Sequence, residues 1–466
     1  MDACEQASAT EAAAPPEEAA APPEAAAAPA ETLSKNARKR LLKLETKESR
    51  KAKRAEERKL RKARRAEAGE PEAGEAEELL AAAADSTALD RVFGAEHHAA
   101  ARRFFAEQLG APRLVLAPMV NQSELAFRLL ARRHGAGLCY TPMLHSKLFA
   151  AKASYREDNF DPHASDRPLV AQFCGDDPAT ILAAAAHVQG RCDAVDLNCG
   201  CPQAIARKGH YGAFLLDEPE LIERIVRTVA CTLRTPIFVK IRILPAGPEG
   251  SSEERTLGLA RRLQAAGCSL LTVHGRTREQ KCRCECDWAL LAKVKAALSI
   301  PVLANGGVES PEQLEACLAA TGCDGAMVSE AALENPSMLG GVPTARLSQC
   351  AVAREYVELA RAHPPKGVAI VKAHLFKILF MALDAHRELR DRLGSVLDSE
   401  EVYAVALEAC EREEATARDD AAAGMSERCD RAGARYVTWY RRHRSAPASE
   451  VADEMPPPLP EASAEP

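Results

Sequence analysis

Short apolar runs alternate with segments of helical periodicity through the middle of the chain. Most of the runs between Arg113 and Gly340 are followed by residues whose apolar positions recur every three or four places, as in an amphipathic helix. The clearest such helical segments are Glu124–His134, Pro219–Leu233 and Pro311–Ala320. The apolar runs are Leu114–Val120, Leu138–Met143, Leu169–Cys174, Ala194–Cys199, Ile237–Ile243, Leu270–His274, Val302–Asn305 and Gly325–Ser329.

This alternation predicts an α/β domain with the fold of a (β/α)8 TIM barrel. Eight strand–helix units within about 230 residues match the size of such a barrel. An open, doubly wound sheet is the alternative, but no G-x-G-x-x-G follows the first strand. We therefore expect residues 91–340 to form a barrel in which the strands all end at one face.

The strand pattern stops after Gly340. Helical periodicity over Ala351–His363, Ala369–Leu393 and Glu400–Arg418 predicts a helical domain spanning residues 341–445. We expect the Pro- and Glu-rich residues 446–466 to be disordered. Basic side chains predict that parts of the helical domain have a positive surface, namely Lys366, Lys372, His374, Lys377, His386, Arg387 and Arg390.

Residues 1–90 have no pattern that could bury a core. The first part is a low-complexity mixture of Ala, Pro and Glu, for which we expect disorder. Residues 33–65 are about half Lys or Arg, and residues 66–85 have the composition of a linker. A basic segment of this kind binds phosphate backbones or acts as a nuclear localisation signal. A solvated charged helix without a specific partner is equally consistent with the sequence.

Composition indicates a globular protein that does not enter a membrane. No apolar run approaches the length of a membrane span, and the acidic N-terminus resembles neither a signal peptide nor an Arg-rich transit peptide. The sixteen cysteines are scattered, mostly in apolar contexts, which favours a reducing compartment without a disulfide framework. We expect a monomer in the cytoplasm, the nucleus or both.

The most informative stretch is Asp196 to Leu216, DLNCGCPQAIARKGHYGAFLL. Its apolar strand ends at Asn198, and Pro202, which lacks an N–H group, prevents the strand from continuing. Cys201 therefore lies on a rigid turn just after a strand end, where barrel enzymes keep their catalytic residues. A buried and inert thiol is the alternative, and it is what we expect for most of the other cysteines.

Polar and small residues also follow the other strands. Gln172 lies within the third apolar run, where its amide needs a partner and can pair with the polar edge of a ring. Lys240 lies in the apolar strand FVKI, and a buried ammonium there is explained if it faces an anionic group such as a reduced flavin. Each position alone has an ordinary structural explanation, but their shared place at strand ends favours a cofactor site. The other members are Pro118, Met119, Val120, His274, Asn305, Gly306, Gly307, Ser329 and Glu330, the last five at strand ends where backbone N–H groups can hold a phosphate.

The sequence resembles the tRNA dihydrouridine synthases. Asn198–Pro202 has their N-x-G-C-P motif, and Lys208–Phe214 is most similar to the branch that acts at positions 16 and 17 of the tRNA D loop. Thr277–Lys281 and His374–Lys377 also match the family. The resemblance covers roughly residues 113 to 415 and leaves out the N-terminal extension.

The resemblance implies a flavin enzyme in which NADPH or NADH reduces FMN, and FMN passes hydride to C6 of a uridine. Cys201 would then donate a proton to C5, which suits a thiol that is mostly protonated at neutral pH. The target base must be flipped out of the folded tRNA, and the helical domain and residues 33–65 are expected to bind the tRNA backbone. By the same resemblance FMN contacts Pro118, Met119, Gln172, Lys240, His274, Asn305, Gly307, Ser329 and Glu330, with Val120 and Gly306 beside them. Substrate contacts are expected from Asn198, Lys208, His210, Arg242 and Arg276.

Three departures from the family pattern stand out. Cys282, Cys284 and Cys286 replace a glycine-containing loop, but their spacing is not that of a zinc site and no second ligand pair is near, so we expect no metal. Cys199 adds a thiol two residues from Cys201 and makes a non-productive disulfide conceivable. Asn305-Gly306-Gly307 replaces the more usual N-G-N or N-G-D and keeps the backbone donors.

Two other functions remain open at this point. A flavin barrel that acts on a free pyrimidine, similar to dihydroorotate dehydrogenase, would need neither the basic extension nor the basic helical domain. A non-catalytic RNA-binding protein built on a decayed barrel would not retain flavin.

Overall fold

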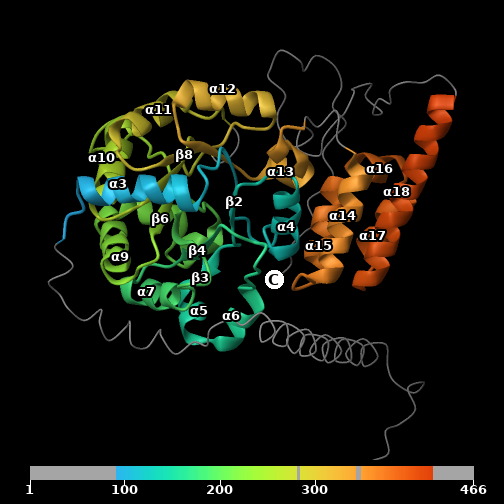
Figure 1. Ribbon diagram of the computed structural model, residues 1–466, viewed down its shortest axis with the longest axis horizontal. Helices are drawn as coiled ribbons and strands as arrows, with labels where there is room; N and C mark the ends of the chain where they lie inside the picture. The colour runs from blue at the N-terminus through green and yellow to red at the C-terminus, as the bar shows by residue number, and fades with distance from the viewer. Residues whose placement is uncertain (1–90, 281–283, 343–347, 423–466) are drawn as a thin grey trace, which may run out of the picture. The chain divides into compact units, whose positions relative to one another are not determined.

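The computed structural model describes residues 91–280, 284–342 and 348–422, and it confirms the barrel (Figure 1). Eight of its nine strands close in the order β1, β2, β4, β5, β6, β7, β8, β9 and back to β1, and all their pairings are parallel. The ninth, β3, lies beside the end of β4. The strands are β1 (Leu114–Leu116), β2 (Leu138–Tyr140), β3 (Leu144–His145), β4 (Leu169–Cys174), β5 (Ala194–Cys199), β6 (Ile237–Arg242), β7 (Leu270–His274), β8 (Val302–Asn305) and β9 (Gly325–Val328).

The first two strands are shorter than predicted. β1 ends at Leu116 rather than Val120, because Pro118 cannot donate to a ladder and the next residues form a turn. In that turn the backbone N–H groups of Gln122 and Ser123 both donate to the carbonyl of Met119. Residues Pro118 to Val120 therefore belong to a loop at the carboxyl end of the barrel rather than to a strand.

Helices surround the barrel, and several begin at side-chain caps. Ser251 and Glu254 form a capping box at the start of α10, and Ser310 caps α12. The surrounding helices are α4 (Leu125–Arg133), α5 (Ser146–Ala151), α6 (Ala153–Asn159), α7 (Pro178–Ala186), α8 (Ala204–Lys208), α9 (Pro219–Thr232), α10 (Ser252–Ala265), α11 (Trp288–Ala297), α12 (Pro311–Thr321) and α13 (Glu330–Glu334), with the 3-10 segments η4 (Gly212–Asp217) and η5 (Pro336–Gly340).

An N-terminal helix that the sequence analysis did not identify covers the bottom of the barrel. It consists of α3 (Ala95–Arg103) and the short π-helix η3 (Phe104–Gln108). Phe105 and Leu109 belong to the apolar cluster inside the barrel, and Phe104 meets Phe238 edge to face at 6.3 Å. These side chains close the end of the barrel opposite to the strand ends that carry the polar residues.

The C-terminal helices form the second part of the chain (orange and red in Figure 1). One predicted helix, Ala369–Leu393, was wrong, because the backbone leaves the helical conformation at Leu379 and at His386. The breaks let buried leucines of all three segments reach one core shared with α14 and α18. The helices are α14 (Gln349–Ala362), α15 (Val368–Ile378), α16 (Phe380–Ala385), α17 (Arg387–Ser395) and α18 (Ser399–Ala422).

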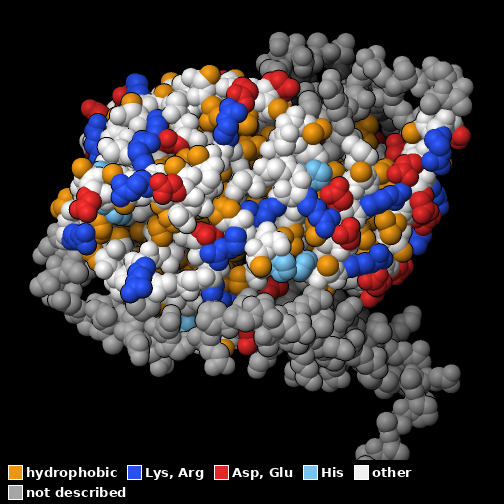
Figure 2. All heavy atoms as spheres, viewed as in Figure 1, with side chains coloured by type: hydrophobic (Ala, Val, Ile, Leu, Met, Phe, Trp, Pro, Cys, Tyr) orange, Lys and Arg blue, Asp and Glu red, His pale blue; other side chains and the backbone are white. Residues whose placement is uncertain are grey.

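The predicted basic surface of this domain is also only partly correct. His374 and Lys377 are buried, so they contribute nothing to the surface. Arg392 and Arg412 pair with Glu408, and Figure 2 shows positive and negative side chains interspersed over the visible face. The Lys/Arg-rich segment 33–65 and the tail 446–466 lie outside the described residues. None of the described helices is long and apolar enough to cross a membrane.

The cover of the barrel bottom yields the first prediction. Phe105→Ala should lower the free energy of unfolding by about 3–5 kcal/mol, because a buried aromatic ring is lost from a packed interior. Val92→Ala, at a side chain that is 71% exposed, is the control and should change it by less than about 0.5 kcal/mol. Urea denaturation measures both, and equal midpoints for the two variants would contradict the assigned role of η3.

Candidate active site

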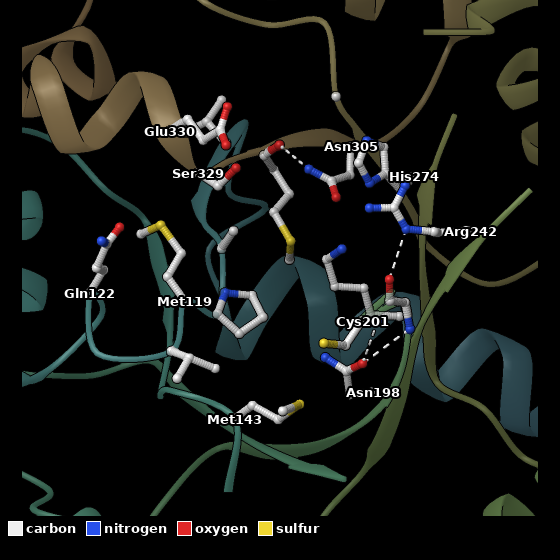
Figure 3. Close-up of a pocket in the computed structure, with 18 of the residues that line it drawn as sticks. Met119, Gln122, Met143, Asn198, Cys201, Arg242, His274, Asn305, Ser329 and Glu330 are labelled. Atoms are coloured by element: carbon white, nitrogen blue, oxygen red, sulfur yellow. Dashed lines mark hydrogen bonds between the residues drawn. The ribbon is translucent and has the colours of Figure 1, made fainter. Parts of the chain in front are cut away.

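A cavity of about 420 Å3 opens where the barrel strands end (Figure 3). Its walls come from the ends of β1, β4, β5, β6, β7, β8 and β9 and from the loops that follow them. The structure thus brings together nearly all of the site residues predicted from the sequence. They are Pro118, Met119, Val120, Gln172, Asn198, Cys201, Lys240, Arg242, His274, Arg276, Asn305, Gly306, Gly307, Ser329 and Glu330.

Two predicted substrate-binding residues do not line this cavity. Lys208 is exposed at the end of α8, and His210 is exposed on the turn that follows. The His210 ring lies between two carboxylates, 2.7 Å from Asp176 Oδ2 and 2.5 Å from Glu218 Oε1. Hydrogen bonds to Asp176 and Glu218 raise the pKa of His210, so this imidazole holds the turn in place from outside the cavity.

The Cys201 turn is fixed by hydrogen bonds on both sides (Figure 3). Asn198 Oδ1 accepts from the backbone N–H groups of Gly200 and Cys201, at 3.1 and 3.0 Å. Arg242 Nε donates to the Gly200 carbonyl at 2.8 Å. Gly212 has φ +70°, and a Cβ there would lie only 2.7 Å from the Cys201 carbonyl oxygen, so this close approach requires glycine. The thiol is therefore presented from a rigid backbone.

Cys201 differs from its neighbouring thiols in its surroundings. It is partly exposed, lines the cavity and packs in a small cluster with Cys174, Tyr211 and Met143. Cys199 is completely buried in the main core, and burial raises its pKa well above the ordinary value. Every described cysteine is a free thiol. Cys199 is accordingly an inert core residue, and Cys201 is the thiol available for chemistry.

The Gln172 amide makes hydrogen bonds to two other side chains, and the sequence did not predict these partners. Its Nε2 donates to Asp196 Oδ2, and its Oε1 accepts from Asn198 Nδ2, both at 2.8 Å. Burial raises the pKa of Asp196 to about 7, although the hydrogen bond from Gln172 and the charge of Lys240 act in the opposite direction. Asp196 was overlooked as a site residue, and its only sequence signal was a carboxylate inside the apolar run AVDL.

The cavity is rich in positive charge. Lys240 pairs in register with Asn198 on β5, and a Cβ on Gly200 would lie 3.8 Å from its Nζ. Burial, together with the charges of Lys240, Arg242 and Arg276, holds the pKa of His274 well below its usual value. The imidazole is therefore neutral at physiological pH, and the cationic groups around it suit an anionic ligand.

Two glycines shape the wall beside His274. Gly306 and Gly307 have φ of +101° and +79°, and a Cβ on either would approach neighbouring side chains within 3.1 Å. One of those neighbours is Cys286, whose Sγ donates to the Asn305 carbonyl at 3.4 Å. Cys284 is exposed and Cys282 lies outside the described residues. Among the side chains that the structure describes, no group of three or more His, Cys, Asp or Glu could hold a metal ion.

The helical domain holds the loop between β1 and α4. Glu124, the residue before α4, accepts from Tyr356 Oη at 3.0 Å and lies 3.0 Å from His374 Nε2. The His374 ring also stacks on Phe127 at 4.4 Å. Burial alone would raise the pKa of Glu124, but His374 holds it below its ordinary value. The matching stretch His374–Lys377 was recognised from the sequence, whereas its partner Glu124 was not.

The neutral state of His274 predicts a specific pH dependence. Below about pH 6.5 the imidazole takes up a proton in the unfolded chain but not in the folded protein, where its pKa is lowered. The free energy of unfolding should therefore fall as the pH falls through that range. His274→Gln should therefore show a shallower loss of thermal stability between about pH 7 and pH 5 than the wild type. Thermal unfolding of both proteins across this range is the measurement, and identical slopes would contradict the assigned environment.

Comparison with known proteins places the chain in a family. The family model described as "Dihydrouridine synthase (Dus)" matches residues 115–416. A Mus musculus protein named "tRNA-dihydrouridine(16/17) synthase [NAD(P)(+)]-like" is 44% identical over 306 residues, which are 65% of this chain and 62% of that protein. The Saccharomyces cerevisiae "tRNA-dihydrouridine(16/17) synthase [NAD(P)(+)]" is 40% identical over 304 residues, which are 62% of this chain and 70% of that protein.

More distant proteins match a smaller part. A Homo sapiens "tRNA-dihydrouridine(20a/20b) synthase [NAD(P)+]-like" protein is 38% identical over 49% of this chain and 70% of its own length. A solved complex of 2-naphthoyl-CoA reductase matches 49% of each chain with a TM-score of 0.40 and 12% identity. The long family match includes the Cys201 turn and the strand ends around the cavity, and the chain belongs to the dihydrouridine synthase family.

Proposed function

We propose that this protein is a flavin-dependent tRNA-dihydrouridine synthase that reduces the C5–C6 bond of uridine at positions 16 and 17 of the D loop. The reductant is NADPH or NADH. The observation that carries the proposal is the Cys201 thiol, held by Asn198 and Arg242 at the edge of a cationic cavity in the barrel mouth. The names of the mouse and yeast relatives support the tRNA substrate, the 16/17 positions and the nicotinamide reductant.

The residues of the cavity fit FMN. Pro118 and Met119 supply an apolar flank for a flat ring, and Lys240 supplies a cation for its anionic locus. Gly306 and Gly307 have a left-handed backbone and line the cavity together with His274 and Arg276, and their backbone N–H groups suit the phosphate. When bound, the flavin supplies the hydride that adds to C6 of the uracil.

Cys201 performs the complementary step. As C6 gains hydride, C5 becomes basic and takes the proton of the thiol, and the resulting thiolate recovers a proton from solvent. The two-electron reduction of one uridine thus consumes one NADPH and one proton. The turn that carries Cys201 is tied to Asn198 and Arg242, so the proton is delivered from a fixed position.

The remaining polar groups position the RNA. Arg276 lines the cavity and suits a uracil carbonyl or a neighbouring phosphate. Lys208 lies outside the cavity and suits a phosphate of the D loop. His210 holds the turn that follows Lys208 through its bond to Asp176. The target base must leave its stack to reach the barrel mouth. The dense positive charge of segment 33–65 suits contacts with the tRNA phosphate backbone. A cytoplasmic or nuclear location stays a prediction.

Replacement of Cys201 tests the proposed acid. Cys201→Ala should fold, retain yellow FMN, accept electrons from NADPH and bind tRNA, because none of these steps uses the thiol. Dihydrouridine formation should fall by roughly 10²- to 10⁴-fold, the usual loss when a positioned general acid is removed. Mass spectrometry of modified tRNA measures the product.

Cys199→Ala is the matched control, since it removes a buried thiol two residues away. It should leave product formation nearly unchanged. Loss of activity in Cys199→Ala with full activity in Cys201→Ala would overturn the assignment. Reduction of a free pyrimidine without tRNA would instead favour the dihydroorotate-dehydrogenase-like alternative, and a colourless protein would favour a non-catalytic barrel.

Removal of residues 1–85 tests the role of the basic extension. The truncated protein keeps α3 and the barrel, so its FMN content and thermal unfolding should equal those of the full chain. Its tRNA affinity should be weaker, and the slope of log affinity against log salt should be shallower because fewer phosphates are neutralised. Unchanged affinity and slope would leave the extension a role in localisation only.

A further inference from the structure

We infer that Asp196 is a positioning residue, which sets the direction of a buried hydrogen-bond relay that runs through Gln172 and Asn198 to the Cys201 turn. The relay serves the proton donor of the proposed function, so the inference rests on that function. Asp196 does not line the cavity and is only 1% exposed. It acts through other residues and touches neither cofactor nor substrate.

The direction of the relay follows from the donors and acceptors along it. Asn198 Oδ1 accepts two backbone N–H groups of the turn, so its Nδ2 is left to donate on the other side. Nδ2 meets Gln172 Oε1, which must be an acceptor, and Gln172 Nε2 must therefore face the opposite way. There it meets Asp196 Oδ2 at 2.8 Å. An ionised carboxylate accepts and does not donate, and a protonated Asp196 carries its proton on Oδ1 when Oδ2 accepts, so the bond from Gln172 Nε2 fixes this orientation of the Gln172 amide.

The relay is built into neighbouring strands. Gln172 on β4 is the register partner of Asp196 on β5, so their side chains lie next to each other inside the barrel. Asn198 follows Asp196 by two residues on the same strand and therefore points to the same side. The three side chains are buried, and no rearrangement of the backbone is needed to connect them.

Packing alone does not explain a carboxyl group at this position. Asp196 Oδ1 is buried and has no hydrogen-bond partner among the residues that the structure describes. An unsatisfied polar atom of this kind costs stability, and an apolar side chain of similar size would avoid that cost. The presence of a carboxyl group at this position is explained if Oδ2 is needed to orient Gln172.

Two further contacts hold the backbone of the turn and do not involve Asp196. Arg242 holds the Gly200 carbonyl, and the N–H group of Ala213 donates to the Cys201 carbonyl. These bonds remain when Asp196 is replaced, so the fold of the turn should survive. Without the acceptor at Asp196, however, the Gln172 amide is free to rotate. A rotated Gln172 would set its amino group against that of Asn198 and so oppose the two bonds that hold Asn198 Oδ1 to the turn. An Asn198 amino group turned toward the N–H groups of Gly200 and Cys201 would push the thiol from its place.

Asp196→Leu tests this inference because it keeps the approximate size and removes the acceptor. Dihydrouridine formation should fall by roughly 10²-fold, the loss that a small misplacement of a catalytic group can cause. FMN retention and thermal stability should be kept, since a buried polar group is replaced by an apolar one. Alkylation of Cys201 by iodoacetamide, followed by peptide mass spectrometry, should become faster by roughly threefold or more, because reactivity follows exposure of the thiol.

Asp196→Asn is the conservative variant. It keeps the shape of the side chain, and its oxygen can accept from Gln172, so product formation and Cys201 alkylation should return to within about threefold of the wild type. Thr272→Val is the matched control, since it removes a buried hydroxyl inside the barrel that bonds Tyr140 and takes no part in the relay. It should leave both measurements unchanged.

The outcomes separate the inference from the proposed function. If the wild type forms no dihydrouridine, the proposed function fails, and the alkylation rates still decide whether Asp196 positions Cys201. If the wild type is active and Asp196→Leu equals it in both measurements, the inference is wrong. A loss that Asp196→Asn shares with Asp196→Leu would also overturn it, because the acceptor would then not be what matters. Should Asp196→Leu fail to fold, Asp196→Ala carries the same expectations.

Discussion

The pairing of β1 with β9 closes the sheet, and every other feature of the cavity depends on that closure. The register sets Leu116 beside Val328, so the loops that follow these two strands leave the barrel side by side. Pro118 and Met119, which follow the first strand, therefore line the same cavity as Ser329 and Glu330, which follow the last strand. Because all the strands are parallel, their polar ends collect at one face, and the opposite face is left for apolar packing by η3.

Polar and charged side chains are buried inside the closed barrel, although their burial costs free energy of folding. Lys240, Arg242 and Arg276 lie around a neutral His274, and an anion bound among them would offset their mutual repulsion. Asp196 lies deeper and reaches the site only through Gln172 and Asn198. The cavity wall therefore combines several cationic side chains with amides whose hydrogen bonds are made within the protein.

The helical domain and the barrel meet through a small number of buried polar contacts. Glu124 accepts from Tyr356 and pairs with His374, and it stands at the start of α4 directly after the loop that lines the cavity. Lys377, from the same helix as His374, has its pKa lowered to about 8 by burial, with Glu330 on the barrel acting in the opposite direction. Through these contacts the helical domain supports the barrel mouth.

The sequence by itself determined the features that depend on local pattern. Alternating periodicity predicted the barrel, and a proline after Gly200-Cys201 located the thiol at a strand end. Fifteen of the predicted site residues line one cavity, because residues at strand ends of a parallel barrel converge whatever their separation along the chain. Features that depend on distant partners were decided only by the tertiary structure. Apolar periodicity could not show that Phe105 enters the barrel, that a helix breaks at Leu379, or that Asp196 and Glu124 have partners, because each outcome depends on what packs against the residue and not on its neighbours in sequence.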